Sequence, residues 1–154
     1  MDAGFLGKER ITSLLWKFSL PAVAGMVVTS LYNVVDSIFV GGAYRNYRLY
    51  VPAIYTGATA RPLILNLHGY TSSASAQQLY SNFMPIADTA NFIIAHPDGT
   101  FDATNNRFWN VFGLSPVDDN GFLTALLDTI ATHYTVNPNK VYATGMSNGG
   151  YMSH

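Results

Sequence analysis

From residue 42 onward, short apolar runs alternate with longer segments in which apolar residues recur at helical spacing. Helical spacing is visible over residues 79–87 and 122–130, and the apolar runs cover residues 47–51, 62–67, 92–95 and 141–144. Strands that are separated by helices need crossover connections, and such connections place neighbouring strands in parallel. The pattern therefore predicts an α/β fold with a mostly parallel sheet and flanking helices.

The last apolar run ends in the pentapeptide Gly145-Met146-Ser147-Asn148-Gly149, which has the form G-x-S-x-G. Between a strand and a helix, this motif places a serine on a sharp turn, with its hydroxyl above the sheet and near the positive end of the helix. We therefore predict that Ser147 is a nucleophile. The alternative is an ordinary strand–helix turn in which Ser147 only caps the following helix.

A second loop supports the first interpretation. His68-Gly69-Tyr70-Thr71 follows the run at 62–67. An oxyanion hole of this kind combines the backbone N–H after the nucleophile with an N–H from the loop after an early strand. We predict Asn148 and Tyr70 as these donors, with Thr71 as the substitute for Tyr70. His68 is expected to hold its loop by a side-chain hydrogen bond.

Composition excludes several classes of site. The chain has 154 residues, no cysteine, a net charge of −1 and only 11% charged residues. Without cysteine there are no disulfides, thiolate metal sites or thiol nucleophiles. The eight Lys and Arg residues are scattered, whereas nucleic-acid binding needs a clustered basic face. We expect no cofactor, no metal and no nucleic-acid partner.

Residues 1–41 form a different segment. No charged residue occurs over positions 18–35, and a membrane-spanning helix needs about 20 mostly apolar residues. We favour a hydrophobic transmembrane helix, with membrane contact through residues 18–40. A signal peptide cleaved after Ala22-Val23-Ala24 and an amphipathic helix remain alternatives. The expected domains are 1–41 and 42–154, and the expected location is extracellular after export or membrane-associated.

Residues 11–41 resemble the first transmembrane helix of multidrug and toxic-compound extrusion (MATE) transporters. The similar stretches are K-F-S-L-P, L-Y-N-V-V-D and I-F-V-G. In a complete transporter, the resemblance would make Asp36 a candidate for ion or proton coupling, because an acid inside a span is costly. We favour the simpler alternative that Asp36 lies near a helix end and reaches water.

Residues 43–154 resemble the N-terminal half of the polyhydroxybutyrate depolymerase and feruloyl-esterase-like α/β-hydrolases. The similar stretches are YRLYVP, PLILNLHGYTSSA, IIAHPDGT, FWN, VDDNGFLTALLDTI and VNPNKVYATGMSNGGYM. The resemblance implies a serine carboxylic ester hydrolase, usually exported, that acts on polyesters or aryl esters. Ser147 would be the nucleophile, and Asn148 and Tyr70 the oxyanion-hole donors. Trp109 would lie near the cleft or pack alone at the surface, and Asp119 would be a helix cap or a loop anchor.

The sequence departs from this family after the serine, where the triad acid and histidine are expected. The seven residues that follow Ser147 include no Asp or Glu, and their one histidine is His154, which we expect to point away from the serine. The predicted hydrolase is therefore incomplete in this sequence, with little or no turnover. A MATE-type transporter fragment and an inert fused or truncated reading frame, joined near residues 40–43, are the alternatives.

Overall fold

The computed structural model describes residues 33–40 and 43–154. The strands are β1 (Asn33–Val40), β2 (Ala43–Tyr50), β3 (Arg61–Leu67), β4 (Ile93–Pro97), β5 (Thr100–Phe101), β6 (Arg107–Phe108) and β7 (Val136–Gly145). The helices are α2 (Ala74–Tyr80), α3 (Met84–Ala90), α4 (Asp119–His133) and α5 (Asn148–Met152). Each of the four predicted apolar runs contributes to a strand, and residues 122–130 lie within α4.

The main sheet has the strand order β1-β2-β4-β3-β7, and β5 and β6 form a separate hairpin. At its centre, β3 runs parallel to both β4 and β7. β2 is antiparallel to β4 and to β1, so the sheet is mixed. Parallel pairing therefore brings the ends of β3 and β7, and the loops that follow them, to one edge of the sheet.

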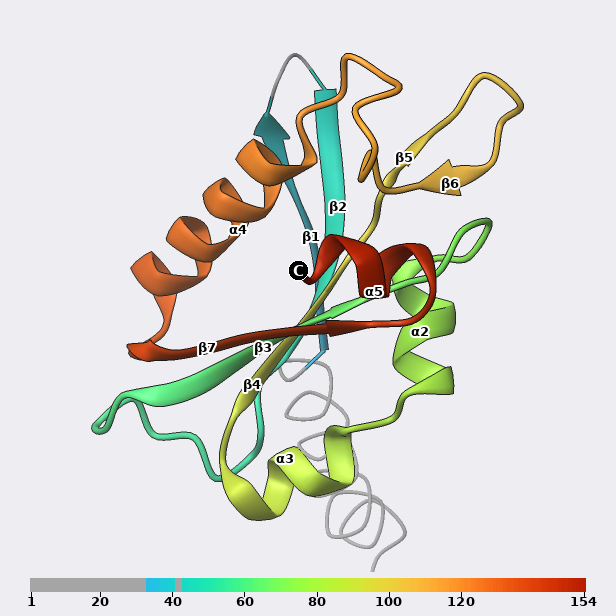
Figure 1. Ribbon diagram of the computed structural model, residues 1–154. Helices are drawn as coiled ribbons and strands as arrows, with labels where there is room; N and C mark the ends of the chain where they lie inside the picture. Colours follow the sequence, from blue (N-terminus) through green and yellow to red (C-terminus); the bar gives the residue numbers. More distant parts are fainter. Residues whose placement is uncertain (1–32, 41–42) are drawn as a thin grey trace, which may run out of the picture. The chain divides into compact units, whose positions relative to one another are not determined.

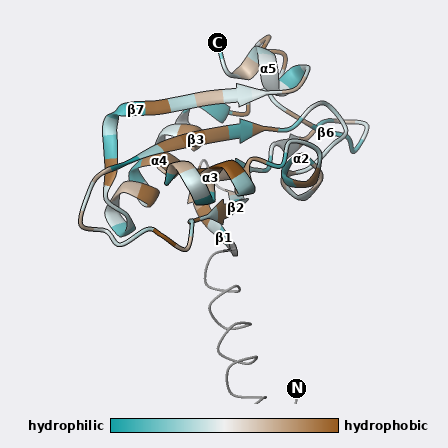
Figure 2. Ribbon diagram, turned by 90° about the horizontal axis from the view of Figure 1, so that it is seen from below, coloured by the Kyte–Doolittle hydropathy of each residue, from teal (hydrophilic) through white to brown (hydrophobic). Residues whose placement is uncertain are grey.

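Helices cover both faces of this sheet (Figure 1). On one face, Arg45 of β2 contacts Asp119 and Phe122 of α4. On the other face, the Tyr50 hydroxyl of β2 donates to Asp88 of α3, and α2 packs on β2, β3 and β4. Hydrophobic residues colour the middle of β3 in Figure 2. Leu63, Leu65 and Leu67 of this strand are buried, because β3 has a neighbour on each side and helices over the sheet.

The helix predicted from the spacing of residues 79–87 is divided between two helices, α2 and α3. α2 ends at Ser81, whose backbone leaves the helical region with φ −110° and ψ 69°. α3 begins with a proline, Pro85, in its first turn. Proline lacks the backbone N–H that a continuous helix would need at this position, so the chain restarts a helix here.

The prediction of a helix over residues 18–40 is wrong for its last part. Residues 33–40 form β1, which pairs with β2 from Asn33↔Tyr50 to Val40↔Ala43. An apolar run rich in Val, Ile and Phe suits a strand as well as a helix, and pairing with β2 supplies the backbone hydrogen bonds. Asp36 is exposed on this strand and accepts a hydrogen bond from the Tyr47 hydroxyl at 3.2 Å.

The remaining residues of the predicted span, 18–32, lie outside the described residues, as do the signal-peptide and amphipathic-helix alternatives. Across the part of the chain that the structure describes, every helix is too short or too polar to cross a membrane. The junction proposed near residues 40–43 stays a prediction.

Candidate active site

Ser147 occupies the turn between β7 and α5. Its backbone has φ 52° and ψ −114°, a region that non-glycine residues rarely adopt and that costs about 1–3 kcal/mol. Its side chain makes no capping hydrogen bond to α5. The alternative of a helix-capping serine therefore has no support in the geometry, whereas a strained turn is what exposes a nucleophile at the end of a strand.

Two glycines make this turn possible by allowing close backbone contact. A Cβ atom at Gly145 would lie 2.5 Å from the carbonyl carbon and oxygen of Gly149. A Cβ atom at Gly149 would lie 2.4 Å from the carbonyl oxygens of Leu67 and His68. The spacing of glycine, serine and glycine in the motif is thus required by the packing of the turn against the end of β3.

The loop after β3 places Tyr70 beside this turn. Within the described residues, the backbone N–H groups of Tyr70 and Asn148 donate to no acceptor. An oxyanion hole needs donors that are not already engaged. Thr71 was the substitute donor, and the structure excludes it. The Thr71 N–H donates to the Arg107 carbonyl at 2.8 Å, so this donor is already engaged.

His68 is a structural residue, as predicted. The Gly99 N–H donates to its Nε2 at 2.9 Å, so Nδ1 carries the proton and donates to the Gly69 carbonyl at 2.7 Å. The ring is completely buried, and this burial lowers the pKa of His68 below its usual value. A neutral imidazole therefore links the loop after β3 to the start of the β5–β6 hairpin.

Trp109 connects the same loop to the Ser147 turn. Its indole is only 1% exposed and lies nearly parallel to the Phe122 ring, with 6.5 Å between the centroids. Its Nε1–H donates to the His68 carbonyl at 2.9 Å. Its backbone N–H donates to Asn148 Oδ1 at 2.6 Å, and Asn148 Nδ2 donates to its carbonyl at 3.0 Å. Of the two alternatives for Trp109, the isolated surface aromatic is therefore wrong, because the indole is buried and bonded.

The loop from Trp109 to α4 is anchored by a buried ion pair. Asp119 accepts from Arg45 at 2.5 Å and from the Asn110 N–H at 2.7 Å. The Asn110 side chain in turn donates to two carbonyls of the loop, those of Ser115 and Val117. Asp119 is thus a loop anchor, one of its two predicted roles. The helix cap is Asp118, which accepts from the Gly121 N–H.

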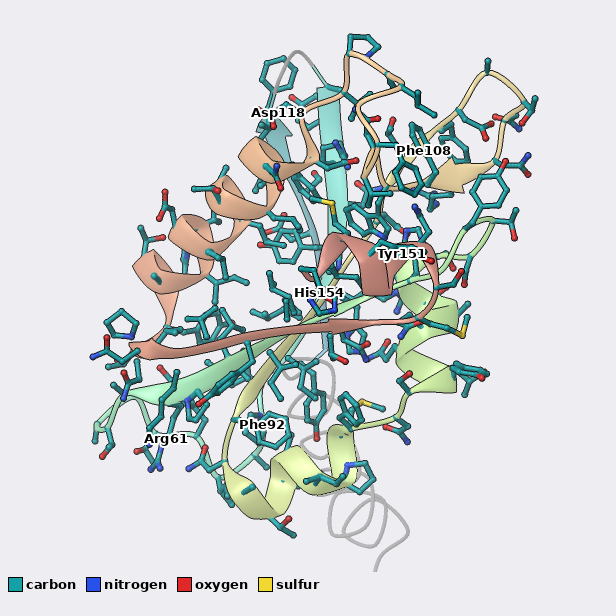
Figure 3. The ribbon with its side chains drawn as sticks, in the orientation of Figure 1. Arg61, Phe92, Phe108, Asp118, Tyr151 and His154 are labelled. Atoms are coloured by element: carbon teal, nitrogen blue, oxygen red, sulfur yellow. The ribbon has the colours of Figure 1, made fainter. Side chains whose placement is uncertain are left out.

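Two hollows flank the Ser147 turn. The apolar hollow, about 260 Å³, is lined by Tyr70, Phe108, Trp109, Asn110, Val111, Phe112, Leu114 and Asn148. The β7-side hollow, about 540 Å³, is lined by Ala143, Thr144, Gly145, Ser147, Gly150, Tyr151, Ser153 and His154. Tyr151 extends from α5, and His154 follows this helix (Figure 3). The Tyr151 ring meets the Phe112 ring with 6.0 Å between centroids, so the two hollows share a border.

No imidazole or carboxylate among the described residues is hydrogen-bonded to the Ser147 hydroxyl. His96 is buried in β4, and His133 is exposed at the end of α4, where its Nδ1 lies 2.9 Å from the Thr129 carbonyl oxygen. Asp102 accepts from the Asn106 N–H and the Tyr70 hydroxyl, and these bonds lower its pKa to about 2. Within the described part of the chain, no group of three His, Asp or Glu side chains could hold a metal.

Sequence reasoning missed Arg45 and Asn110, which hold the loop before α4, and Arg107, which holds the β5–β6 hairpin. Arg107 donates to the Gly99 carbonyl at 2.9 Å and lies over the Phe101 ring. The low charge content is the one signal that could have found the two arginines, whereas nothing in the sequence marks Asn110. Where only 11% of residues are charged, an arginine between apolar positions of a strand is a candidate for a buried pair, since charge is costly to bury alone.

Comparison with curated proteins finds esterases and depolymerases. Over 104 residues, the chain is 33% identical to feruloyl esterase B of Piromyces equi, covering 67% of this chain and 19% of the relative. It is 31% identical over 104 residues to poly(3-hydroxybutyrate) depolymerase of Ralstonia pickettii, covering 60% of this chain and 21% of that protein. It is 27% identical over 113 residues to a bifunctional acetylxylan esterase/xylanase of Neocallimastix patriciarum, covering 73% of this chain and 16% of that protein. The chain therefore spans about a fifth of the length of these relatives.

Solved structures agree on the fold. An S-formylglutathione hydrolase from Agrobacterium tumefaciens matches with a TM-score of 0.65 at 17% identity, over 79% of this chain and 50% of that one. An acetyl xylan esterase from Aspergillus awamori matches with a TM-score of 0.59 at 16% identity, over 75% of this chain and 43% of that one. No family model matches the chain. None of these similarities supports the transporter resemblance of residues 11–41. Residues 33–40 and 43–154 have an α/β-hydrolase-like fold, with the predicted nucleophile at its strand–helix turn.

Proposed function

We propose that this chain carries the nucleophile and the oxyanion hole of a serine carboxylic ester hydrolase. The observation that supports this most is the backbone of Ser147, which is held in a strained turn between Gly145 and Gly149. The esterase relatives support the same reaction class. In this proposal, the substrate is an aryl ester or a polyester of hydroxy acids.

The reaction assigns a role to each group. The Ser147 hydroxyl attacks the ester carbonyl, and the backbone N–H groups of Tyr70 and Asn148 bind the oxygen that becomes negative. Two such donors matter because removing one typically lowers the rate by about 10²–10³. The Asn148 side chain is hydrogen-bonded to the backbone of Trp109, and His68, in the loop after β3, accepts a hydrogen bond from Gly99. These hydrogen bonds hold the two donors in place.

A serine hydroxyl also needs a base to remove its proton. None of the described residues is hydrogen-bonded to Ser147 as such a base, although His154 lines the same β7-side hollow. We therefore expect slow turnover of p-nitrophenyl acetate by this chain, because the oxyanion hole and substrate binding alone leave about 10³–10⁴-fold over water. Export stays a prediction, since residues 1–32 lie outside the described residues.

Covalent labelling tests the proposal directly. The full chain is treated with a fluorophosphonate probe, and the modified residue is located by mass spectrometry. We expect the label on Ser147, its loss in Ser147→Ala, and its retention in Ser153→Ala. Ser153 is the matched control because it lines the same hollow but donates to the Gly150 carbonyl. A folded chain that labels no faster than Ser147→Ala would contradict the proposed nucleophile.

A further inference from the structure

The loop between β6 and α4 presents apolar side chains to solvent. Residues 111–117, here called the rim loop, have the sequence VFGLSPV and carry no charge. At the tip of the loop, Phe112 and Leu114 are 71% and 87% exposed. Gly113 lies between them with a φ of 65°, and a Cβ atom at this position would have no other atom within 4 Å. The tip therefore stands in open space rather than against the sheet.

The exposed apolar surface continues from the rim loop onto two other elements. The ring of Phe112 lies 6.0 Å from the ring of Tyr151 in α5, measured between centroids, and Tyr151 is exposed. Tyr70, in the loop after β3, is also exposed and lines the same hollow as Phe112 and Leu114. We call these four side chains the apolar rim. A continuous exposed apolar patch marks an interaction surface, whereas isolated apolar residues do not.

Hydrogen bonds at the base of the rim loop hold its shape. Asn110 Oδ1 accepts from the Ser115 N–H, and Asn110 Nδ2 donates to the carbonyls of Ser115 and Val117. The Val117 N–H donates to the Ser115 hydroxyl, and the Val111 N–H donates to the Trp109 carbonyl. These bonds close the loop, so the tip is held outward by a fixed base and its exposure does not require a mobile segment.

The backbone of the tip restricts the kind of partner. Among the described residues, no acceptor is bonded to the backbone N–H groups of Phe112, Gly113 and Leu114. Unpaired N–H groups are costly in pure hydrocarbon, whereas the headgroup region of a lipid layer offers oxygen acceptors next to apolar chains. A fluid layer also deforms around a protruding tip, which a solid surface does not. The tip therefore fits the boundary between lipid headgroups and acyl chains, where interfacial protein segments bind.

The charges around the rim indicate a neutral lipid. Anionic lipids attract exposed Lys and Arg side chains. Lys140 is the one exposed Lys or Arg of the described residues, and it lies on β7 outside the rim. The charges that adjoin the rim are acidic, because Asp118 follows the rim loop and Asp102 accepts from the Tyr70 hydroxyl. An anionic surface would therefore be repelled, and a zwitterionic surface would not.

We propose that the apolar rim binds a neutral lipid–water interface. In this arrangement, Phe112 and Leu114 enter the layer below the headgroups, and Tyr70 and Tyr151 lie among the headgroups. Tyrosine is typical of this level because its ring is apolar and its hydroxyl is polar. The inference goes beyond the proposed function and does not rest on it, because binding requires no reaction at Ser147.

A fluorescent probe at the tip tests the proposal, because the chain has no cysteine and a single introduced one is labelled alone. The full chain with Leu114→Cys carries a nitrobenzoxadiazole probe and is mixed with phosphatidylcholine vesicles. We expect about a twofold rise in probe fluorescence as the tip enters the layer, and quenching by spin-labelled lipids. The matched control is a probe on Leu79→Cys, an exposed position of α2 outside the rim, where no change is expected.

Removal of the aromatic pair of the rim tests which side chains bind. With the probe still at position 114, the full chain carries Phe112→Ala and Tyr151→Ala, two exposed side chains whose loss leaves the core intact. We expect half of the fluorescence change to need about tenfold more lipid, since burial of one large apolar side chain is worth at least this factor. The matched control is Phe39→Ala with Tyr44→Ala, which removes another exposed aromatic pair and should leave the lipid dependence unchanged.

The probe reports its own position, so attachment of the chain to vesicles elsewhere is distinguished from insertion of the rim. Equal responses at positions 114 and 79, or an equal loss in the two aromatic-pair variants, would overturn the proposal. So would a response confined to phosphatidylglycerol vesicles, which would assign the binding to charge. A response without vesicles that grows with protein concentration would assign the rim to a second copy of the chain. A response only to solid poly(3-hydroxybutyrate) particles would assign it to a polymer surface.

Discussion

The backbone conformation of Ser147 depends on the packing of its neighbours. Its strained backbone persists because Gly145 and Gly149 allow the turn to press against the carbonyl groups at the end of β3. The strain is therefore balanced by contacts that involve no side chain of Ser147 itself. Changes to the two glycines are expected to affect the turn more than changes to any exposed residue of α5.

Gly149→Ala tests this dependence. The new methyl group would lie 2.4 Å from two backbone carbonyl oxygens, which cannot move without shifting β3. Overpacking of this kind lowers the free energy of unfolding by about 1–3 kcal/mol. We expect Gly149→Ala to lose an amount in the upper part of that range, as measured by urea unfolding. Gly150→Ala is the control, since its nearest contact would be 3.2 Å. Equal destabilisation by the two variants would show that the close approach is not what holds the turn.

His96 predicts how stability responds to acid. Neither ring nitrogen has a partner among the described residues. Burial, with a smaller effect of Arg48, lowers its pKa to about 4. Because an unfolded histidine titrates near 6.5, the unfolded state binds more protons between these two values. The free energy of unfolding should therefore decrease as the pH falls from about 6.5 to 4, by up to about 3 kcal/mol from this residue.

The measurement is urea unfolding at several pH values in His96→Leu and in His133→Leu. We expect a flatter pH dependence in His96→Leu only, because His133 is exposed on α4. Some slope remains, since burial lowers the pKa of His68 in the same direction. An unchanged slope in His96→Leu would show that His96 is not the group responsible.

At the scale of elements, the loop between β6 and α4 carries the wall of the apolar hollow without regular structure of its own. Its order comes from Asp119 at the start of α4, which binds Arg45 of β2 and the Asn110 N–H. This arrangement connects a strand, a loop and a helix through one carboxylate. The position of this loop therefore depends on the buried carboxylate of Asp119, which is not among the residues that line the apolar hollow.

Asp119→Ala should consequently be among the more damaging substitutions. It leaves the Arg45 guanidinium buried without its partner, and breaking a buried pair from one side costs about 3–5 kcal/mol. Calorimetric unfolding should show a much lower melting temperature than in Asp128→Ala, which removes an exposed carboxylate from the same helix. The double variant Arg45→Met with Asp119→Leu should recover much of the loss, because no charge is then left buried. Failure to recover would assign the loss to the loop contacts instead.

At the scale of the whole described unit, β7 is one of the two edge strands of the sheet, and β1 is the other. β7 pairs with β3 on one side, and within the described residues no strand pairs with its other side. Tyr142 in this strand is 54% exposed. An unpaired apolar edge is a template for association with other chains.

Tyr142→Lys should reduce self-association, since a charge on an edge strand opposes pairing between chains. Sedimentation velocity over a range of protein concentrations measures the effect. Tyr80→Lys is the control, because Tyr80 is 73% exposed on α2, away from any sheet edge. If both variants reduce association equally, net charge rather than the edge of β7 controls it.

The sequence by itself determined the features that depend on neighbouring residues. The strand, glycine turn and helix around Ser147 follow from local periodicity and from the spacing of Gly145 and Gly149. The same is true of α4, whose apolar residues recur at helical spacing, and of Tyr70, which follows a buried strand. In each case the preference arises within one turn or one strand, so the pattern is visible without knowing what packs on it.

Only the tertiary structure decided what depends on distant partners. Residues 33–40 became a strand because β2 pairs with them, although their composition also suits a helix. Thr71 lost its expected role because the Arg107 carbonyl, 36 positions later, accepts its N–H. Asp119 meets Arg45 across 74 positions, and together with Asn110 they shape the wall around Trp109. Such contacts depend on the three-dimensional path of the chain, which local propensity does not specify.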